Sequence, residues 1–363
     1  MKFLDLPSLV QRKVFLKVEP QETVLLTFCS TKIRKRLVEL TRRDISVLEF
    51  EYTTKGKSIR INRKPNKKTF EWCLDPVGLS REERRSPKRF SVKNGSDTHY
   101  CSIYEDKFGF LSCKIDLENV SRMVEHLRGL FRIAPLKLNI DPEIIPNLKR
   151  LLSDPVYQQL DTFLLSGLYI TWTKLSSIFN SIPIQNRAVV TTERIHGPVN
   201  KRCKVFKANV VFFRDARWMT WEHLFSFDFE KAVFRNVTLT TDDLIAFLKH
   251  WRDSGNTKLV AFILYTDRVA GSVRWDMNAI VAEMGAQPWD RARRSRYAKF
   301  DEELLYQVKK DNKNSCSEHI CTERGLDFER SDGLLASIQG NTSTFFFNVW
   351  YDRFPQYPCD WPE

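Results

Sequence analysis

Six strand-like runs recur through the middle of the chain at nearly equal intervals, and this spacing restricts the possible folds more than any other feature. The runs begin near Leu136, Leu160, Arg187, Ala208, Ala232 and Leu259, so their starts are 24, 27, 21, 24 and 27 residues apart. Units of that length hold one strand and one helix, which predicts an α/β fold with a largely parallel sheet and helices outside it. The unit size matches leucine-rich repeats, but their strict L-x-x-L-x-L-x-x-N signature is missing. A repeat-like (leucine-rich-repeat-like) strand–helix domain and an ordinary layered α/β domain are therefore equal alternatives.

Helix-start signals lie between most of these runs. Asp141-Pro142-Glu143 has an N-cap, a proline and an acid in the order that opens a helix. Thr171, Thr220 and Thr241 each precede apolar residues at helical spacing. After the last unit, Leu326–Glu329, Leu335–Gln339 and Thr344–Trp350 are strand-like and separated by turn residues, which predicts a closing β-hairpin.

The first part of the chain has a different pattern. Residues 1–42 predict three short helices, and residues 43–113 hold alternating strand-like runs between basic loops. Three prolines mark an irregular end. We therefore expect a helical segment at 1–42, a β-rich connector at 43–113, an α/β domain at 114–350 and an irregular tail at 351–363.

The sequence lacks the common cofactor and metal motifs. The closest two of its 13 glycines, Gly333 and Gly340, are seven residues apart, which excludes both the Walker and the Rossmann glycine patterns. The six histidines are never closer than 27 residues, so HExxH is absent. Cys316, His319 and Cys321 cluster in a polar stretch, but a zinc site would need a fourth ligand, and a solvated loop is the favoured interpretation. We expect no cofactor and no metal.

The apolar segments are too short for a membrane span. The longest, Leu259–Tyr265, has seven residues, whereas a spanning helix needs about 20. An acid and Pro7 interrupt the first residues before a signal peptide could form, and the eight cysteines include no CxxC pair. We therefore expect an intracellular protein, cytoplasmic and/or nuclear, with no membrane partner.

The N-terminal segment resembles an F-box. The resemblance rests on the opening Phe3-Leu4-Asp5-Leu6-Pro7, the apolar Val14-Phe15, the joint Val18-Glu19-Pro20 and Ser30-Thr31-Lys32 near the third helix. F-boxes have a Leu-Pro opening, an apolar helix, a Leu/Met-Asp-Pro joint and a Ser-Lys pair. Here Val18-Glu19-Pro20 stands at the joint.

A second stretch is similar to the second type of F-box-associated domain, found in large nematode F-box families. It runs from Trp218–Phe225 through Asn236–Thr240 to Asp242–Trp251, where Ile245 replaces the usual Asn of the family's Asp-Leu-Asn-x-Phe-Leu-Lys-x-Trp helix. Leu326–Gly333 and the closing Asn348-Val349-Trp350 also resemble that domain's end.

Together these resemblances imply a non-catalytic substrate-recognition subunit of an SCF-type E3 ubiquitin ligase. The F-box would dock onto the Skp-family adaptor, which binds a cullin scaffold and a RING subunit, and the associated domain would hold an unknown substrate protein. The apolar residues of the segment exceed what three small helices can bury, which indicates a partner surface. The expected adaptor-binding residues are Leu6, Pro7, Val10, Val14, Phe15, Val18, Pro20, Val24 and Leu25. Alternatively, this helical segment packs on its own β-rich connector.

Two other functions stay open from the sequence. A net charge of +13 would attract phosphate, so a nucleic-acid-binding protein that uses basic loops is the alternative, although no known nucleic-acid motif appears. Basic loops could also recruit an acidic substrate or simply be solvated. A hydrolase triad assembled in space cannot be found by spacing. His223 and His250 lie on amphipathic helices, where packed or half-exposed histidines are usual, and Trp172, Trp221 and Trp251 are expected in the core.

Overall fold

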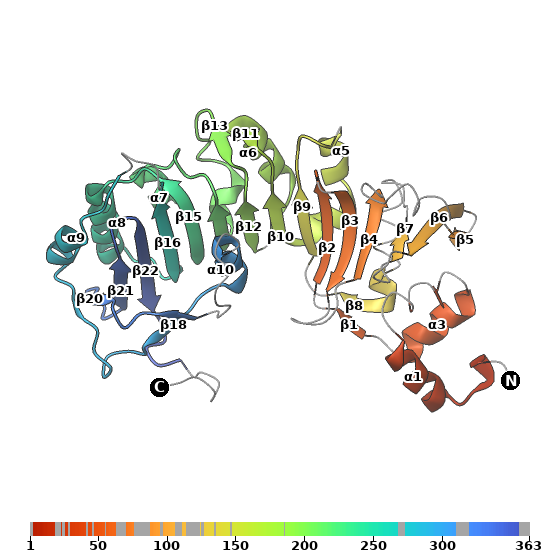
Figure 1. The fold of residues 1–363 in the computed structure, drawn as a ribbon. Coiled ribbons are helices and arrows are strands. Elements are labelled where there is room, and N and C mark those ends of the chain that lie inside the picture. The colour runs from red at the N-terminus through yellow and green to blue at the C-terminus, as the bar shows by residue number, and fades with distance from the viewer. Residues whose placement is uncertain are drawn as a thin grey trace. The chain divides into compact units, whose positions relative to one another are not determined.

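The structure, a computed structural model, divides the chain into two compact units (Figure 1). Unit 1 is Met1–Ser166 with Ser181–Pro183, and unit 2 is Gly167–Asn180 with Ile184–Glu363. The structure describes residues 3–355 apart from 19–22, 24–25, 28–29, 41–42, 46, 55, 63–69, 76–87, 95–96, 106–110, 114–123, 125–126, 134–135, 146, 185, 268–272 and 310–318. The four-part division made from the sequence stays a prediction.

Unit 1 begins with a helical segment. A 3-10 turn, η1 (Phe3–Asp5), leads into α1 (Ser8–Lys17), and α3 (Thr31–Leu40) follows. Phe15 of α1 and Leu37 of α3 are buried, as befits two short helices that share a small core.

The main sheet of unit 1 combines antiparallel and parallel strands in the order β4-β3-β2-β9-β10. The antiparallel meander consists of β2 (Val47–Thr53), β3 (Gly56–Asn62) and β4 (Phe70–Asp75). On its other side, β2 pairs in parallel with β9 (Leu136–Ile140), which pairs in parallel with β10 (Leu160–Leu165). The strands predicted within 43–113 are thus confirmed, and the first long one joins the parallel series.

Unit 1 also contains two smaller sheets. The antiparallel one consists of β5 (Lys88–Asn94), β6 (Asp97–Glu105) and β7 (Leu111–Cys113). The parallel one pairs β1 (Arg43–Ile45) with β8 (Phe131–Ile133).

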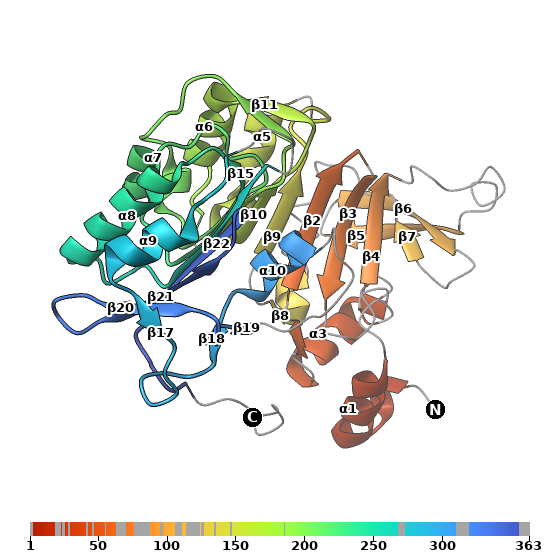
Figure 2. The ribbon, with the colours of Figure 1, turned by 60° about the vertical axis from the view of Figure 1, so that its left-hand side comes forward.

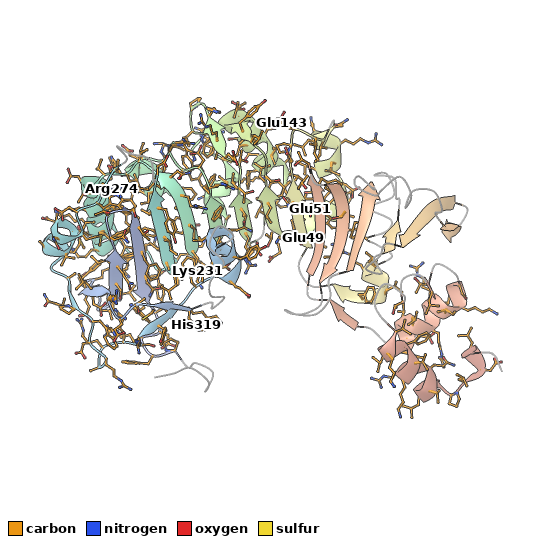
Figure 3. The ribbon with its side chains drawn as sticks, in the orientation of Figure 1. Glu49, Glu51, Glu143, Lys231, Arg274 and His319 are labelled. Carbon is orange, nitrogen blue, oxygen red and sulfur yellow. The ribbon has the colours of Figure 1, made fainter. Side chains whose placement is uncertain are left out.

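Strict alternation along β2 separates an apolar face from a polar face. Leu48, Phe50 and Tyr52 are buried on one side, where η4 (Pro155–Gln159) supplies Tyr157. The Phe50 and Tyr157 rings meet edge to face at 5.5 Å, and the Tyr52 and Tyr157 hydroxyls are 2.9 Å apart. Glu49 and Glu51, labelled in Figure 3, alternate with these residues along the same strand.

Unit 2 is built on the predicted parallel strands. β12 (Arg187–Val190), β14 (Val210–Phe213), β15 (Lys231–Val237) and β16 (Ala261–Thr266) pair in parallel and in that order. The sheet continues in antiparallel fashion through β22 (Thr344–Trp350), β21 (Leu335–Gly340), β20 (Leu326–Glu329) and β17 (Gln287–Pro288). The closing antiparallel strands are therefore confirmed.

Helices cover one face of this sheet (Figure 2). They are α6 (Trp172–Ser181), α7 (Trp221–Ser226), α8 (Thr241–Asp253) and α9 (Met277–Met284). Aromatic side chains fill the layer beneath them: Phe213 stacks on Phe234 at 6.1 Å, and Trp251 meets Phe347 at 5.1 Å. This arrangement confirms a mixed α/β fold with a mostly parallel sheet.

Shorter elements complete the described chain. They are α5 (Leu148–Leu152), β11 (Tyr169–Thr171), β13 (Arg194–His196), η5 (Lys204–Lys207), β18 (Tyr297–Lys299), α10 (Glu302–Lys309) and β19 (His319–Cys321). None of the helices described here is long and apolar enough to span a bilayer.

Three local predictions were wrong. Asp141 caps no helix, because its carboxylate accepts from the Glu143 amide in a turn, and α5 begins at Leu148 with Asn147 as N-cap. The cap of α8 is Thr240, one residue before Thr241, and it shares a reciprocal capping box with Asp243. Trp221 is exposed at the start of α7, although Trp172 and Trp251 are buried as expected.

Candidate functional site

The first candidate site is an apolar surface on α1, which we call the α1 apolar face and define as Leu9, Val10, Val14 and Leu16. These four side chains are exposed by 63, 40, 40 and 52%. The helix has only ten residues, so such a surface is a large share of it. Exposed apolar patches of this kind on a small module are typical of protein interfaces.

A buried glutamine explains why the valines face solvent. Gln11 is almost completely buried, and its amide donates to the Leu4 and Leu6 carbonyls at 3.0 and 2.6 Å. Its Oε1 accepts from Arg36 Nε at 2.9 Å, which ties α1 to α3. Gln11 and Phe15 are four residues apart and thus form the packed face, which turns Val10 and Val14 outward.

The structure places most of the expected adaptor-binding residues on or beside this surface. Pro7, Val10 and Val14 are exposed, Leu6 and Val18 are half-buried, and Phe15 is buried, whereas Pro20, Val24 and Leu25 lie outside the described residues. Sequence reasoning missed Leu9 and Leu16. Their seven-residue separation, two helical turns, was the signal that could have identified them.

The second candidate site is the edge of unit 2 at which its parallel strands end. Carboxyl ends of parallel strands share one edge of a sheet, and ligands of open α/β sheets bind there. The loops after β12 and β14 meet at this edge, and so does the segment before α6 (Figure 1). Lys231, labelled in Figure 3, begins β15 at the opposite edge.

A two-stranded ribbon lies at this edge. β11 and β13 pair in parallel, with Tyr169 opposite Arg194 and Thr171 opposite His196. These four side chains are exposed, while the central Ile170 and Ile195 are buried. The only sequence signal for these strands was a single isoleucine between two more polar residues in each. Alternation over three residues is too short to predict a strand.

Asp215 fixes the ribbon to the loop that follows β14. Its buried carboxylate accepts from the Ile195 amide at 2.8 Å and from Arg217 Nε at 2.7 Å. The Asp215 carbonyl also accepts from Trp218 Nε1 at 2.8 Å. The same bond to Asp215 raises the pKa of the Arg217 guanidinium.

A residue with a strained backbone conformation is hydrogen-bonded to the loop after β14. Asn236, at a bulge in β15, has a φ of 57°, a left-handed conformation that non-glycine residues rarely adopt. Its side-chain amide donates to the Arg214 carbonyl at 3.0 Å, and the Arg235 carbonyl accepts from the Ala216 amide at 2.8 Å. Strain that surrounding bonds maintain is typical of functional sites.

His223 caps the neighbouring helix α7 in its neutral form. Its Nδ1 accepts from the Thr220 amide at 3.1 Å, which a protonated ring cannot do. Burial lowers the pKa of His223, and the Lys201 charge lowers it further against the opposing effect of Glu222. We assign this histidine a structural role.

A small pocket of about 80 Å³ opens between α7 and α8. Phe225, Phe247 and His250 border it, and the Phe225 and His250 rings are 4.3 Å apart. The buried Trp251, whose Nε1 has no hydrogen-bond partner among the described residues, also lines the pocket. Its volume suits a small side chain and is below the roughly 150 Å³ that holds a benzene ring.

The basic run Arg291–Arg296 is not a free cationic surface. Arg293 pairs with Glu329 at 3.1 Å, Arg294 is completely buried against Asp327, and Arg296 pairs with Glu323 at 2.7 Å. Only Arg291 of these four arginines lacks an ion pair among the described residues. This finding removes one of the basic segments on which nucleic-acid binding would depend.

The cysteine–histidine cluster finds no support as a metal site. His319 and Cys321 lie on β19, which pairs with β18, and Cys316 lies outside the described residues. In the part of the chain that the structure describes, no group of three or more His, Cys, Asp or Glu side chains is placed to hold a metal ion.

Comparison with known proteins places the loop after β14 in a family segment, whereas the ribbon of β11 and β13 lies outside that segment. A family model described as F-box associated matches residues 203–264, which span β14, α7, β15, α8 and most of β16. No solved structure matches the chain significantly.

Two Caenorhabditis elegans proteins align with 97% of the chain. Uncharacterized protein F59B2.9 is 23% identical over 367 residues and is covered to 80% of its length. Uncharacterized protein F59B2.8 is 26% identical over 371 residues and is covered to 78%. The chain thus contains a segment that matches the second type of F-box-associated domain, and it is similar along most of its length to nematode proteins.

Proposed function

We propose that this protein is the substrate-recognition subunit of an SCF-type E3 ubiquitin ligase. Residues 1–42 act as the F-box and dock on the Skp-family adaptor, which links the chain to a cullin scaffold. Unit 2 holds the substrate protein, and the chain itself supplies no catalytic residue. Its working compartment is the cytoplasm, the nucleus or both.

The observation that carries the proposal is the exposure of the α1 apolar face in a chain that also contains an F-box-associated domain. Gln11 and Phe15 are the buried residues of α1, whereas Leu9, Val10, Val14 and Leu16 keep 40–63% of their surface exposed. An apolar surface that the fold does not need is explained by a partner that covers it. Burial of these aliphatic side chains against a partner would contribute binding free energy in proportion to the apolar area removed from water.

The strand–helix units give the proposal a second support. Successive parallel strands with helices on one face resemble the stacking of leucine-rich repeats, in which an extended surface holds a partner protein. We therefore propose a repeat-like domain that presents its partner-binding surface on unit 2.

The test is capture of purified Skp-family adaptor by the full chain at about 50 and about 300 mM salt, two concentrations that screen surface charge very differently. Wild-type protein should bind at both concentrations. The double variant Val10→Asp/Val14→Asp should lose binding, and so should Leu6→Ala/Pro7→Ala. Lys35→Asp, a change at an exposed position on α3 and thus off the α1 apolar face, is the matched control for added charge.

Two results would contradict the proposal. One is the absence of adaptor binding by well-folded wild-type protein. The other is binding that the valine variants leave intact. Tight, strongly salt-dependent binding of nucleic acid without adaptor binding would instead favour the alternative function.

A further inference from the structure

The ribbon of β11 and β13 carries cations that the fold does not neutralise. Arg194 and Arg214 are exposed and make no ion pair with any described residue, and the same is true of Lys201 and Arg202 in the loop after β13. Arg217, in contrast, is satisfied by Asp215. Since the arginines of Arg293–Arg296 are paired, the unpaired charge of this edge is a distinct feature.

Two exposed apolar side chains lie beside Arg194. Leu168 is 69% exposed and Tyr169 is 57% exposed, although both belong to a segment bonded to the ribbon. The Leu168 carbonyl accepts from the Arg194 amide at 3.1 Å, and the Gly167 carbonyl accepts from the Glu193 amide at 3.3 Å. The apolar and cationic groups are thus held together by backbone hydrogen bonds.

We infer that this surface, defined as Leu168, Tyr169, Arg194, His196 and Arg214, binds an extended acidic segment of a partner protein that carries an aliphatic or aromatic anchor. Charge complementarity selects the acidic segment, because Arg guanidinium groups bind carboxylates with paired hydrogen bonds. Leu168 and Tyr169 select the apolar anchor.

The spacing of the ribbon suits an extended chain. The Tyr169–Arg194 pair and the Thr171–His196 pair are two residues apart along their strands, or about 7 Å. Alternate side chains of an extended segment repeat at the same distance. Such a segment lying along the ribbon would present every second residue to it.

A protein ligand fits this surface better than a nucleic acid. Leu168 offers an aliphatic contact, which neither a base nor a phosphate needs, and only two of the five side chains, Tyr169 and His196, are rings that could stack on a base.

The frame behind the surface is rigid enough for specific binding. Asp215 bonds to both the ribbon and Arg217, and Asn236 holds the Arg214 carbonyl. A preorganised surface loses less entropy when a partner binds than a mobile loop does. The inference rests on the proposed function only in that the partner would be the ligase substrate.

The experiment is selection of a random peptide library on the immobilised full chain, followed by fluorescence anisotropy with an enriched peptide. Wild-type protein should enrich peptides that combine several Asp or Glu residues with an aliphatic or aromatic residue. Arg194→Glu/Arg214→Glu should lower the affinity for the enriched peptide at least about tenfold, and Tyr169→Ala should lower that affinity several-fold. Arg291→Glu, an exposed unpaired arginine elsewhere in unit 2, should leave binding unchanged.

Each other outcome overturns the inference: no enrichment, enrichment of neutral or basic peptides, or binding that the edge variants do not weaken. The same holds if single-stranded DNA, used as a competitor, binds this edge more tightly than the peptides do. Adaptor capture by the same samples separates the two claims. Loss of peptide binding with intact adaptor binding refutes only this inference, whereas failure of adaptor binding refutes the proposed function.

Discussion

Arg294 and Asp327 form an ion pair in unit 2 although neither side chain reaches solvent. The guanidinium Nη2 and Nε lie 2.8 and 2.9 Å from the Asp327 carboxylate oxygens. Thr322 and the Ser295 carbonyl accept the remaining Arg294 donors, and Ser337 donates to Asp327 at 2.7 Å. Because the donors and acceptors of this buried pair are hydrogen-bonded, the pair holds the segment that contains Arg294 against strands β20 and β21.

Removing one charge of this pair should destabilise unit 2 strongly. We expect Asp327→Asn to cost about 3–5 kcal/mol of unfolding free energy, because it leaves the buried Arg294 charge uncompensated. Urea denaturation followed by tryptophan fluorescence measures it, since Trp72 is the only one of the nine tryptophans in unit 1. Glu323→Gln, at the exposed pair with Arg296, should change stability by less than about 1 kcal/mol. Equal losses in the two variants would refute the role of the buried pair.

Gly325 should tolerate no side chain, because it lies against the same network. A Cβ at this position would be 2.9 Å from the Thr322 carbonyl and 3.2 Å from Arg294 Nη2. We expect Gly325→Ala to destabilise unit 2 by about 1–3 kcal/mol through overpacking. Gly255→Ala is the control, since nothing lies within 4 Å of its Cβ, and its thermal midpoint should match that of the wild type. An unchanged midpoint in Gly325→Ala would contradict this packing.

Unit 1 should lose stability in alkaline solution. Burial raises the pKa of both Tyr52 and Tyr157 above the ordinary value of 10, so both hydroxyls stay protonated in the folded protein. The unfolded chain ionises them from about pH 10, so their contribution is complete below that pH and is lost as the pH rises above it. Hydrogen exchange of the β2 amides between pH 9 and pH 11, corrected for intrinsic rates, should show this loss. The double variant Tyr52→Phe/Tyr157→Phe should flatten the dependence, and Tyr306→Phe, at an exposed position, should leave it as steep as in the wild type.

Substitutions at buried and at exposed positions of α1 should have different effects on stability. Phe15→Ala should cost about 3–5 kcal/mol of the local unfolding free energy, because it empties the core shared with Leu37. Val10→Ser/Val14→Ser should change it by less than about 0.5 kcal/mol per site, since both side chains already face solvent. Hydrogen exchange of the α3 amides reports this free energy. If the serine variant unfolds as readily as Phe15→Ala, the valines belong to the core and not to a partner surface.

Periodicity predicted the parallel strands of the main sheet of unit 2 and the helices α6, α7 and α8, because buried parallel strands are short, continuous apolar runs. Val210–Phe213 is buried throughout, and Ala261–Thr266 is buried at all but one position. The helix starts were less accurate. Thr240 and Thr241 are chemically equivalent caps, so only the reciprocal bond to Asp243 decides between them.

The site residues were harder to predict, because their roles depend on contacts between distant segments. Val10, Val14 and Val18 are equally spaced valines, but the Gln11–Arg36 bond, which no local pattern shows, turns the first two outward. Arg294 belongs to a run that reads as basic and exposed until its partner 33 residues later is known. The ribbon at Tyr169 and Arg194 has only three residues per strand, which is below what alternation can resolve.

Hydrogen exchange of the full chain with and without purified Skp-family adaptor tests the central claim most directly. The account predicts that the adaptor slows exchange in residues 3–17, where the α1 apolar face lies, and leaves the carboxyl edge of unit 2 unchanged. The Val10→Asp/Val14→Asp variant should show no protection at the same adaptor concentration. Protection confined to unit 2, or no protection anywhere with a folded adaptor, would contradict the claim that this chain enters a ubiquitin ligase through its N-terminal helices.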